Sequence, residues 1–562
     1  MINKKNKKNT EDELIFLPLG GTGEIGMNLN LYGYGPEAAR QWIMIDLGVT
    51  FSDGSTPGID VIMPDTAFIE EHQKDLLAIV LTHAHEDHIG AVAHLWPRLR
   101  CPVYATPFTA ELVRAKLAEA GLDSVVPLHV VELGGRFDIG PFDIEYVTLT
   151  HSIPEPNAIA IRTKLGTVMH TGDWKIDPNP VVGDDIDRKR LAEIGDEGVR
   201  AMVCDSTNVF TPGEAGSEAD VAKSLTELVG ELSGRVVVTT FASNVARLES
   251  VIRAAEANDR HVVLAGRSMF RMIAAARKTG HLKNLPPFVE AEDAGFLPRD
   301  KVLFLCTGSQ GEPRAALARI ASDAHRDITL GSGDTVIFSS RIIPGNDVSI
   351  FEMQNDLARS GVRVITEKDH FVHVSGHPCR DELTAMYQWI KPEVSVPVHG
   401  EARHLLEHAA LAQELQVPET LVLENGDMVR LAPGAATVID EVPNGRLVLD
   451  GNVLVPSWDM GIQERRRLAY AGTVFVSVVL SAKGEVLGDI EVRLIGLPER
   501  DRSGDKFEEI AYEAIDQALN LLPQRKRGDD AHVAEYLRRA VRGAIRREWG
   551  KKAAVEIVVT RV

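Results

Sequence analysis

The run Thr82–His88, with the sequence THAHEDH, follows an apolar stretch and carries four side chains that can bind metal ions. In an extended segment, residues two positions apart project to the same side, so His83 and His85 can hold one ion together. Asp87 and His88 come just after the expected bend, at a helix start, where they can face a second ion. Neutral imidazoles and a carboxylate suit Zn²⁺ or Mn²⁺. This density of ligands favours a two-metal site over a loop that is rich in histidine by chance.

One loop cannot complete two coordination shells, so further ligands are expected where other strands end. His151 follows FDIEYVTLT, Asp173 follows TVMHTG, and His399 follows EVSVPV. An aspartate has two oxygens and can bridge two metals, which makes Asp173 the natural shared ligand. Each residue alone could be a loop or cap residue, but together they favour metal ligands. Other histidines lack this context, among them His72, His94, His129, His170, His261, His281, His404 and His408.

The elements that position these residues are readable in the first part of the chain, residues 12–208. Short apolar runs alternate there with turns that contain Gly, Pro and Asp, which is typical of strands. Helices fit residues 89–99 and 109–121. Strands interrupted by helices predict sheets whose outer faces are covered by helices. The expected strands are 14–19, 42–47, 76–82, 142–150 and 167–172.

Between residues 209 and 369 the pattern changes to alternating strands and helices, which predicts a parallel sheet. FVHVSGH (371–377) and EVSVPVHG (393–400) then return to strand ends that bear histidine. The simplest interpretation is one metal-binding domain at 12–208 and 370–442, interrupted by an inserted α/β domain. The expected strands of the insertion are 235–241, 261–266, 301–308 and 335–341, and its expected helices are 244–258, 269–280 and 313–324.

The last part of the chain predicts a turn-rich linker at 443–460 and a small α+β domain at 461–562. The strand VLVP (453–456) lies at the junction. Further strands are expected at 473–482, 488–497 and 554–562, with helices near 505–522 and 531–548.

Chain length, net charge and the distribution of cysteines and apolar residues limit the class of protein. The chain has 562 residues, enough for three or four domains, and a net charge of -20, so binding of a polyanion would need local basic patches or metal ions. Four widely spaced cysteines fit a reducing compartment and exclude a disulfide framework. The N-terminus lacks the apolar core of a signal peptide, and no stretch reaches the ~20 apolar residues of a membrane span. We expect a cytoplasmic protein with no membrane contact.

The sequence HVSGH (373–377) offers a hydroxyl, a glycine amide and two imidazoles within five residues. Glycine allows close approach of the backbone, and these donors suit an anion. The alternative is a simple tight turn, and the residues alone do not decide between the two.

The order of these residues resembles known families. HxHxDH followed by a His, an Asp and a His is similar to the metallo-β-lactamase superfamily. Asp205 in MVCDSTN, His377 in HVSGH and His399 in VPVHG are similar to the three motifs of β-CASP nucleases. GGTGEIGMN, DLGVTF, PGIDVIMPD, HSIPE, TGDWKID, FASN and HVSGH together resemble the bacterial ribonuclease J family along nearly the whole chain. The implied fold is an α/β metallo-β-lactamase αββα sandwich with an inserted β-CASP domain and a small C-terminal α+β domain.

The resemblance also implies roles for individual residues. It assigns His83, His85 and His151 to one metal ion, and Asp87, His88 and His399 to the other, with Asp173 shared and catalytic. His377 would neutralise the phosphate or protonate the leaving oxygen, and Asp205 and Asp46 would orient ligand histidines. The residues implied to bind the nucleotide are His373, Val374, Ser375, Gly376 and His377, with Phe241, Ala242 and Ser243.

The activity implied by the resemblance is that of a metal-dependent ribonuclease. It would act as a 5′-to-3′ exonuclease, with endonuclease activity, on single-stranded RNA that carries a 5′-monophosphate, in maturation of RNA (including rRNA) and mRNA decay. Two divalent ions, Zn²⁺ or Mn²⁺, and a homodimer or tetramer are expected. The alternatives are a DNA-processing β-CASP nuclease, a small-molecule hydrolase, and an RNA-binding scaffold subunit with a degenerate site.

Two further patterns have ordinary explanations. Gly21, Gly23 and Gly26 match a dinucleotide-binding fingerprint, but a strand rather than a helix is expected after them, so a tight turn near the metal loop is favoured. Residues 525–552 contain ten Lys or Arg against four Asp or Glu. This basic stretch, like Arg465–Arg467, could contact RNA or a second chain, or could be a solvated helix face.

Overall fold

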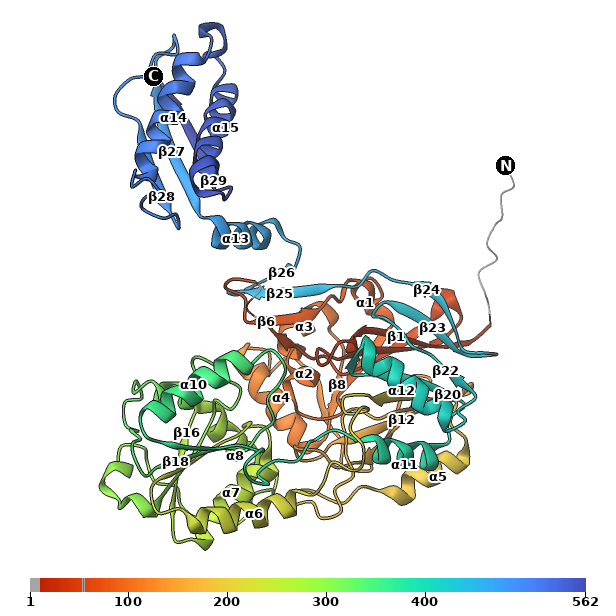
Figure 1. Ribbon diagram of the computed structural model, residues 1–562. Helices are drawn as coiled ribbons and strands as arrows, with labels where there is room; N and C mark the ends of the chain where they lie inside the picture. The colour runs from red at the N-terminus through yellow and green to blue at the C-terminus, as the bar shows by residue number, and fades with distance from the viewer. Residues whose placement is uncertain (1–10, 53, 55) are drawn as a thin grey trace, which may run out of the picture. The chain divides into compact units, whose positions relative to one another are not determined.

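The computed structural model describes residues 11–52, 54 and 56–562 (Figure 1). The chain divides into two compact units, one with residues up to Thr50 and Ile62–Arg446, the other with Phe51–Val61 and Leu447–Val562. Within the described residues, no helix is both long and apolar enough to cross a membrane.

The first unit contains a sheet of eight strands built mainly from the N-terminal part of the chain. Strands 14–19, 42–47 and 76–82 of the sequence prediction are confirmed within one or two residues. The order across this sheet is β24 (Thr437–Glu441), β23 (Asp427–Ala432), β1 (Glu13–Gly20), β3 (Leu29–Gly35), β4 (Gln41–Ile45), β7 (Leu76–Val80), β8 (Val103–Ala105) and β9 (Leu128–Val130).

A second sheet of seven strands packs against the first. Its order is β10 (Arg136–Ile139), β11 (Phe142–Thr148), β12 (Asn157–Thr163), β13 (Gly166–His170), β14 (Ala201–Asp205), β20 (Val394–Val398) and β22 (Glu419–Thr420). Phe16 and Tyr32 of the first sheet share one buried core with Tyr146 and Val203 of the second. The two sheets therefore form a sandwich whose inner faces are apolar.

Helices cover the outer faces of this sandwich. Met202 and Cys204 of β14 pack against Leu191, Leu383 and Leu411, which belong to three helices on the outside of the second sheet. The helices on this face are α5 (Arg188–Glu197), α11 (Arg380–Ile390) and α12 (Ala402–Glu414) (Figure 1). The first sheet has α1 (Ala67–Glu71), α3 (Val92–Leu99) and α4 (Pro107–Glu119) beside it. The αββα sandwich expected from the sequence is confirmed.

The inserted domain leaves the second sheet after β14 and returns at β20. These two strands are neighbours and parallel, and their register pairs Asp205 with Val398. More than 180 residues of sequence therefore separate two strand ends that lie side by side. This pairing brings Asp205 next to His399, the residue after Val398.

The insertion has its own five-stranded sheet, and every strand pair in it is parallel, as the βαβ pattern predicts. Helices α9 (Ala316–Ala321) and α10 (Asp347–Arg359) pack on one face, and α7 (Val245–Ala257) contacts β16 and β17. The remaining helices are α6 (Glu218–Glu231) and α8 (Arg267–Lys278). The strand order is β16 (His261–Ala265), β17 (Val302–Cys306), β15 (Val236–Thr239), β18 (Thr335–Phe338) and β19 (Arg363–Ile365).

Three local expectations are corrected. The helix expected at 89–99 is two helices, α2 (Glu86–Ile89) and α3. The helix expected at 313–324 is confined to α9. The stretch 371–377 is not a strand: it has no ladder partner and is held by side chains, as described below.

The second unit contains a hairpin and the C-terminal α+β domain. The hairpin, β25 (Arg446–Asp450) and β26 (Val453–Pro456), occupies most of the stretch expected to be a linker. Arg465, one of the ambiguous arginines, forms an ion pair with Asp450. After α13 (Met460–Ala471), a three-stranded sheet follows in the order β28 (Glu491–Ile495), β27 (Thr473–Leu480) and β29 (Ala554–Arg561). Helices α14 (Phe507–Leu521) and α15 (Asp530–Trp549) cover one face of this sheet.

Candidate metal centre

The sandwich brings the ends of several strands to one edge. Asp173 and His399 follow β13 and β20, and Asp205 is the last residue of β14, the strand between them; the three strands are parallel neighbours. In the other sheet, the parallel strands β4 and β7 are followed by Asp46 and by the run Thr82–His88. Carboxyl ends of parallel strands meet at the same edge of a sheet, so the topology itself gathers these side chains.

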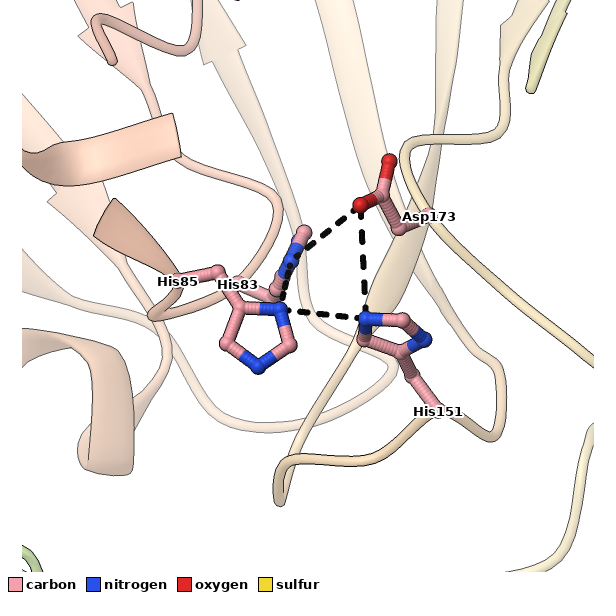
Figure 2. A group of neighbouring side chains, drawn as sticks. All are labelled: His83, His85, His151 and Asp173. Carbon is pink, nitrogen blue, oxygen red and sulfur yellow. Dashed lines mark hydrogen bonds and ion pairs between the residues drawn. The ribbon is translucent and has the colours of Figure 1, made fainter. Parts of the chain in front are cut away.

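Figure 2 shows the first cluster, which consists of His83, His85, His151 and Asp173. His85 Nδ1 lies 3.1 Å from His83 Nε2 and 3.1 Å from His151 Nε2. Asp173 Oδ2 is 3.9 Å from His83 Nε2 and 4.0 Å from His151 Nε2. His83, His151 and Asp173 are buried, while His85 is half-buried.

The second cluster consists of Asp87, His88, Asp173 and His399. His88 Nε2 is 3.2 Å from Asp173 Oδ2 and 3.5 Å from Asp87 Oδ2. His399 Nε2 is 3.2 Å from the same Asp87 oxygen. Asp173 therefore belongs to both clusters, as expected for a shared ligand.

Neutral acceptors fix the protonation of the histidines in the first cluster. His151 Nδ1 bonds to the Gly376 carbonyl, which can only accept, so the proton of this ring lies on Nδ1. Thr82 Oγ1 donates to Asp46 Oδ2 at 2.8 Å, so it accepts from His83 Nδ1 at 3.0 Å. Both rings therefore direct the lone pair of Nε2 into the cluster.

In the second cluster, carboxylates support the Nδ1 side of each histidine, directly at His88 and through a threonine at His399. His88 Nδ1 donates to Asp46 Oδ2 at 2.7 Å. His399 Nδ1 donates to Thr207 Oγ1 at 2.9 Å, and Thr207 Oγ1 in turn donates to Asp205 Oδ1 at 2.7 Å. Here too Nε2 of each ring is left for a cation.

The donor set fits divalent metal ions. In the first cluster, Nε2 of His83 and Nε2 of His151 both lie 3.1 Å from His85 Nδ1, which can carry only one proton and so can donate to only one of them. Asp173 Oδ2 is buried and makes no well-aligned hydrogen bond with the described residues; its nearest nitrogen neighbours are Nε2 of His88, His83 and His151, at 3.2, 3.9 and 4.0 Å. A buried carboxylate oxygen without a partner is costly unless it is paired or coordinates a metal ion. Imidazole nitrogens with carboxylate oxygens are the donors that Zn²⁺ and Mn²⁺ accept.

The two clusters differ in electrostatics. Burial lowers the pKa of His83 and His151 well below the usual value, and lowers that of His85 to about 4. These rings are therefore neutral at physiological pH, which is the form that binds metal ions. In the second cluster burial acts in the same direction on His88 and His399, but the surrounding aspartates outweigh it and raise both pKa values. The second cluster thus attracts positive charge more strongly.

A third group places His377 beside the metal ligands. His377 Nδ1 donates to Asp205 Oδ2 at 2.8 Å, and its ring stacks at 5.5 Å from the ring of His399. Burial would lower the pKa of His377, but Asp205 outweighs burial and raises it. Its side chain remains 23% exposed, so Nε2 can reach a ligand that enters the site.

The stretch 373–377 forms one wall of the site. A Cβ atom at Gly376 would lie 2.7 Å from His151 Cε1, so only glycine fits this close approach. Asn208 Nδ2 holds the stretch from outside, donating to Ser375 Oγ at 2.7 Å and to the His377 carbonyl at 3.0 Å. His373 has a buried Nδ1 with no hydrogen-bond partner among the described residues. Burial and three nearby cations, the first of them Arg247, lower its pKa to about 3.

Residues 241–243 lie between β15 and α7, at the carboxyl end of the inserted sheet, and are half-buried. In the described part of the chain, no hydrogen bond joins their side chains to 373–377. The connection runs through Arg247, one turn further along, whose guanidinium donates to the Val372 carbonyl at 2.9 Å. The sequence-predicted nucleotide-binding residues therefore belong to adjoining elements, and their contact with a nucleotide stays a prediction.

The glycine-rich turn lies beside the second cluster and is not followed by a helix. Strand β3 comes after it, which confirms that it is no dinucleotide fingerprint. The short strands β2 (Thr22–Gly23) and β21 (Gly400–Glu401) pair in parallel, and His399 N donates to the Gly21 carbonyl at 2.6 Å. Gly21 has φ +84°, and a Cβ there would meet Asn28 Oδ1 at 2.2 Å.

Histidines predicted to lie outside the site do so. None of the eight belongs to the three ligand clusters found among the described residues. His170 bonds to Tyr32 Oη, and His408 bonds to Ser206 Oγ and Tyr387 Oη. These buried rings are satisfied by neutral partners of the core.

Asp46 and Asp205 were predicted to orient histidines of the clusters, but the other residues that contact these histidines were not predicted. Thr82, Thr207 and Asn208 stand in the quoted runs THAHEDH and MVCDSTN, directly beside expected ligands. Their position next to a strand-end aspartate or histidine was the available signal. Asn28, whose Nδ2 lies 3.1 Å from His88 Nε2, follows the glycine turn and gave no comparable signal.

Family models match the chain from its first sheet to its end. They are described as metallo-beta-lactamase superfamily (residues 37–230), Ribonuclease J, beta-CASP domain (233–357), Zn-dependent metallo-hydrolase RNA specificity domain (361–420) and Ribonuclease J C-terminal domain (460–562). Their order matches the interrupted sandwich, the inserted parallel sheet and the C-terminal α+β domain.

Several relatives match nearly the whole of this chain. The chain is 51% identical to Ribonuclease J of Sinorhizobium meliloti over 98% of both chains. It is 38% identical to that of Corynebacterium glutamicum over 96% of this chain and 74% of the relative. With that of Mycolicibacterium smegmatis it is 39% identical over 93% of each chain. The chain therefore belongs to the ribonuclease J family and is a metal-dependent ribonuclease.

Proposed function

We propose that this ribonuclease removes nucleotides stepwise from the 5′ end of single-stranded RNA that carries a 5′-monophosphate, and that it can also cut internally. The observation that carries the proposal is the contact between 373–377 and the metal clusters. Gly376 touches His151 through its carbonyl, and His377 bonds to Asp205 within reach of both clusters. We propose that an anion held by this stretch lies one nucleotide from the metal ions.

The proposed ligands of one ion are His83, His85 and His151, and those of the other are Asp87, His88 and His399, with Asp173 shared. Zn²⁺ fits these donors best, and Mn²⁺ is the alternative. When bound, such a pair of ions supplies Lewis acidity at the phosphate and lowers the pKa of water towards neutrality. Asp46 and Asp205 then act by fixing the ring tautomers of the ligand histidines.

His377 is the proposed proton donor to the leaving 3′ oxygen. Because His377 Nδ1 donates its proton to Asp205, Nε2 is the ring nitrogen that can contact the substrate. Because its pKa is raised, the ring carries a proton on Nε2 over a wider pH range than a free histidine. The same proton can neutralise charge on the scissile phosphate before it is transferred.

Local charge supports an anionic ligand despite the net charge of -20. Arg247, Arg341 and Lys175 lie close enough to lower the pKa of His373. Arg341 is exposed, and its guanidinium makes no hydrogen bond or ion pair with the described residues. A 5′-terminal phosphate beside His373, Ser375 and His377 would find donors and positive charge there.

The proposed assembly is a homodimer, with a tetramer as the larger alternative, in the cytoplasm. The outer face of the C-terminal sheet exposes Phe475, Ile495 and Val558, an apolar surface suited to a second chain. All four cysteines are free and buried, which fits a reducing compartment. Light scattering of the wild type and of Phe475→Glu tests the assembly, since a monomeric wild type would exclude it.

The central experiment compares RNA substrates that differ only at the 5′ end. Purified protein with Mn²⁺ or Zn²⁺ is incubated with 5′-monophosphorylated, 5′-triphosphorylated and 5′-hydroxyl RNA, beside DNA of matching sequence. We expect release of mononucleotides, fastest from monophosphorylated RNA. Equal rates on all three RNAs would overturn the phosphate preference, and larger fragments alone would indicate a purely endonucleolytic enzyme. Equal or faster cleavage of the DNA would contradict the preference for RNA.

A further inference from the structure

Arg247 is a fully buried arginine of the inserted domain that no metal ligand contacts. It lies on α7, with 0% of its side chain exposed. Its guanidinium makes five hydrogen bonds: two to Glu218, two to Ser339 and one to the Val372 carbonyl. A buried guanidinium is tolerated only when its donors are satisfied in this way.

The Val372 carbonyl begins the stretch 373–377 and depends on this arginine. It accepts from Arg247 Nη1 at 2.9 Å and from Ser339 Oγ at 2.7 Å. Val372 itself is fully buried. The stretch that carries His377 has no strand ladder, so side chains supply its anchors: Asn208 holds its end, and Arg247 with Ser339 holds its start.

On its other side, the Arg247 guanidinium is connected to the metal-binding domain through Glu218. Its partner Glu218 is 2% exposed and starts helix α6. Glu218 N donates to Asp177 Oδ2 at 2.9 Å, and Asp177 forms an ion pair with the buried Lys175 at 3.0 Å. Lys175 and Asp177 follow shortly after Asp173 in the chain. Arg247 therefore lies in a continuous buried network between the shared ligand's loop and the stretch 373–377.

We infer that Arg247 is a positioning residue for the ribonuclease reaction: through the Val372 carbonyl it holds the stretch 373–377, and with it His377, against the metal clusters. The inference rests on the role proposed for His377. The planar fork of arginine is essential because it bonds Glu218 on one side while donating to two carbonyl oxygens on the other. A lysine keeps the charge and can pair with Glu218, but it cannot hold both ends.

The test compares Arg247→Lys with a matched control, Arg260→Lys. Arg260 is also a buried arginine of the inserted domain and donates to three backbone carbonyls, those of Leu232, Gly234 and Val302. These carbonyls lie at the amino ends of the strands, away from 373–377. Both substitutions remove buried hydrogen bonds, so both are expected to lower the melting temperature by a few degrees. Only Arg247→Lys is expected to lower kcat, by on the order of tenfold to a hundredfold, with bound metal unchanged.

A double-mutant cycle with His377→Ala separates positioning from general damage. If Arg247 acts through His377, Arg247→Lys should lower kcat in the wild type but have little further effect in His377→Ala. If the two substitutions lowered kcat by independent factors that multiply in the double variant, Arg247 would not act through His377 and the inference would be overturned. If His377→Ala alone left kcat unchanged, the proposed function of His377 would fail instead.

Hydrogen exchange supplies a readout that does not depend on activity. In the metal-loaded protein, the amides of residues 372–377 and of Cys379 should exchange at least about tenfold faster in Arg247→Lys than in the wild type or in Arg260→Lys. Unchanged exchange in this stretch would contradict the inference whatever His377 does. If Arg247→Lys does not fold, Ser339→Ala, which removes one of the two donors to the same carbonyl, replaces it in both measurements.

Discussion

The two metal clusters are built from the same kinds of ligand but are supported in different ways. In the first cluster, His151 bonds to a backbone carbonyl and His83 to a threonine hydroxyl, both neutral acceptors. In the second cluster, His88 bonds directly to the carboxylate of Asp46, and a chain from Thr207 to Asp205 stands behind His399. A carboxylate behind a ligand histidine raises its basicity and fixes its tautomer more firmly than a neutral acceptor does.

The two clusters therefore depend on different parts of the fold. The support of the second cluster comes from strand ends of the sandwich itself, because Asp46 follows β4 and Asp205 is the last residue of β14. The support of the first cluster comes partly from Gly376, which belongs to the stretch after the inserted domain. A change at Gly376 itself should therefore disturb the first cluster before the second.

The largest effect is expected where the clusters meet. Asp173→Ala removes the shared carboxylate, whose Oδ2 lies 3.2 Å from His88 Nε2 and 3.9 Å from His83 Nε2. We expect cleavage to fall by more than about 10³-fold and both metal ions to be lost, because neither cluster keeps its bridging ligand. Metal content by mass spectrometry and rates on monophosphorylated RNA measure this. Two bound ions and a normal rate in the variant would exclude a shared ligand.

The residues of the two clusters could be grouped from the sequence because each lies at or shortly after the end of an apolar strand. Strand ends at one edge of a sandwich meet whatever the exact register, so His151, Asp173 and His399 needed only the strand pattern to be grouped with Thr82–His88. The αββα sandwich and the parallel insertion followed from the same patterns. The order of strands within each sheet did not, because it depends on pairings between distant segments, such as β23 with β1.

The supporting contacts could not be predicted from spacing. The Gly376 carbonyl reaches His151 across 225 positions, and Asn208 reaches Ser375 across 167. The stretch 371–377, which contains Val372 and Val374, was interpreted as a strand end that bears histidine, like 393–400. These valines are buried, but the backbone between them is held by Arg247 and Asn208 rather than by a ladder. An alternating pattern reports burial and does not show which partner satisfies the backbone.

A methyl group at position 376 should disturb the first cluster selectively. In Gly376→Ala the new Cβ would lie 2.7 Å from Cε1 and 2.9 Å from Nδ1 of His151, so the ring must shift. We expect a loss of activity on the order of a hundredfold, with one of two metal ions retained. Titration with a chelator while bound metal is counted measures this. Retention of both ions at wild-type affinity would show that the site accommodates the shifted His151 ring.

Removal of the carboxylate behind His88 should affect the other cluster. In Asp46→Asn the amide can still accept from Thr82 N, but its NH₂ group faces His88 Nδ1, which is itself a donor. Asparagine tolerates the left-handed backbone at this position, where φ is 63°, so the fold should be kept. We expect metal affinity at the second cluster to fall by about ten- to a hundredfold, while the first cluster is nearly unaffected. Equal losses at both clusters would mean that Thr82, which Asp46 also holds, couples them.

The smallest effect is expected when the threonine hydroxyl that accepts from His399 Nδ1 is removed. Thr207→Ala removes the acceptor of His399 Nδ1, but Asp205 Oδ1 remains 3.5 Å from the same nitrogen and can take over part of its role. The loss should be about 1 kcal/mol, or roughly fivefold in metal affinity at the second cluster. If the carboxylate provides the support, the combination of Thr207→Ala with Asp205→Asn should cost far more than the two single losses together. Additive losses would instead show that Asp205 serves His377 alone, and the contrast between the clusters would then rest on Asp46.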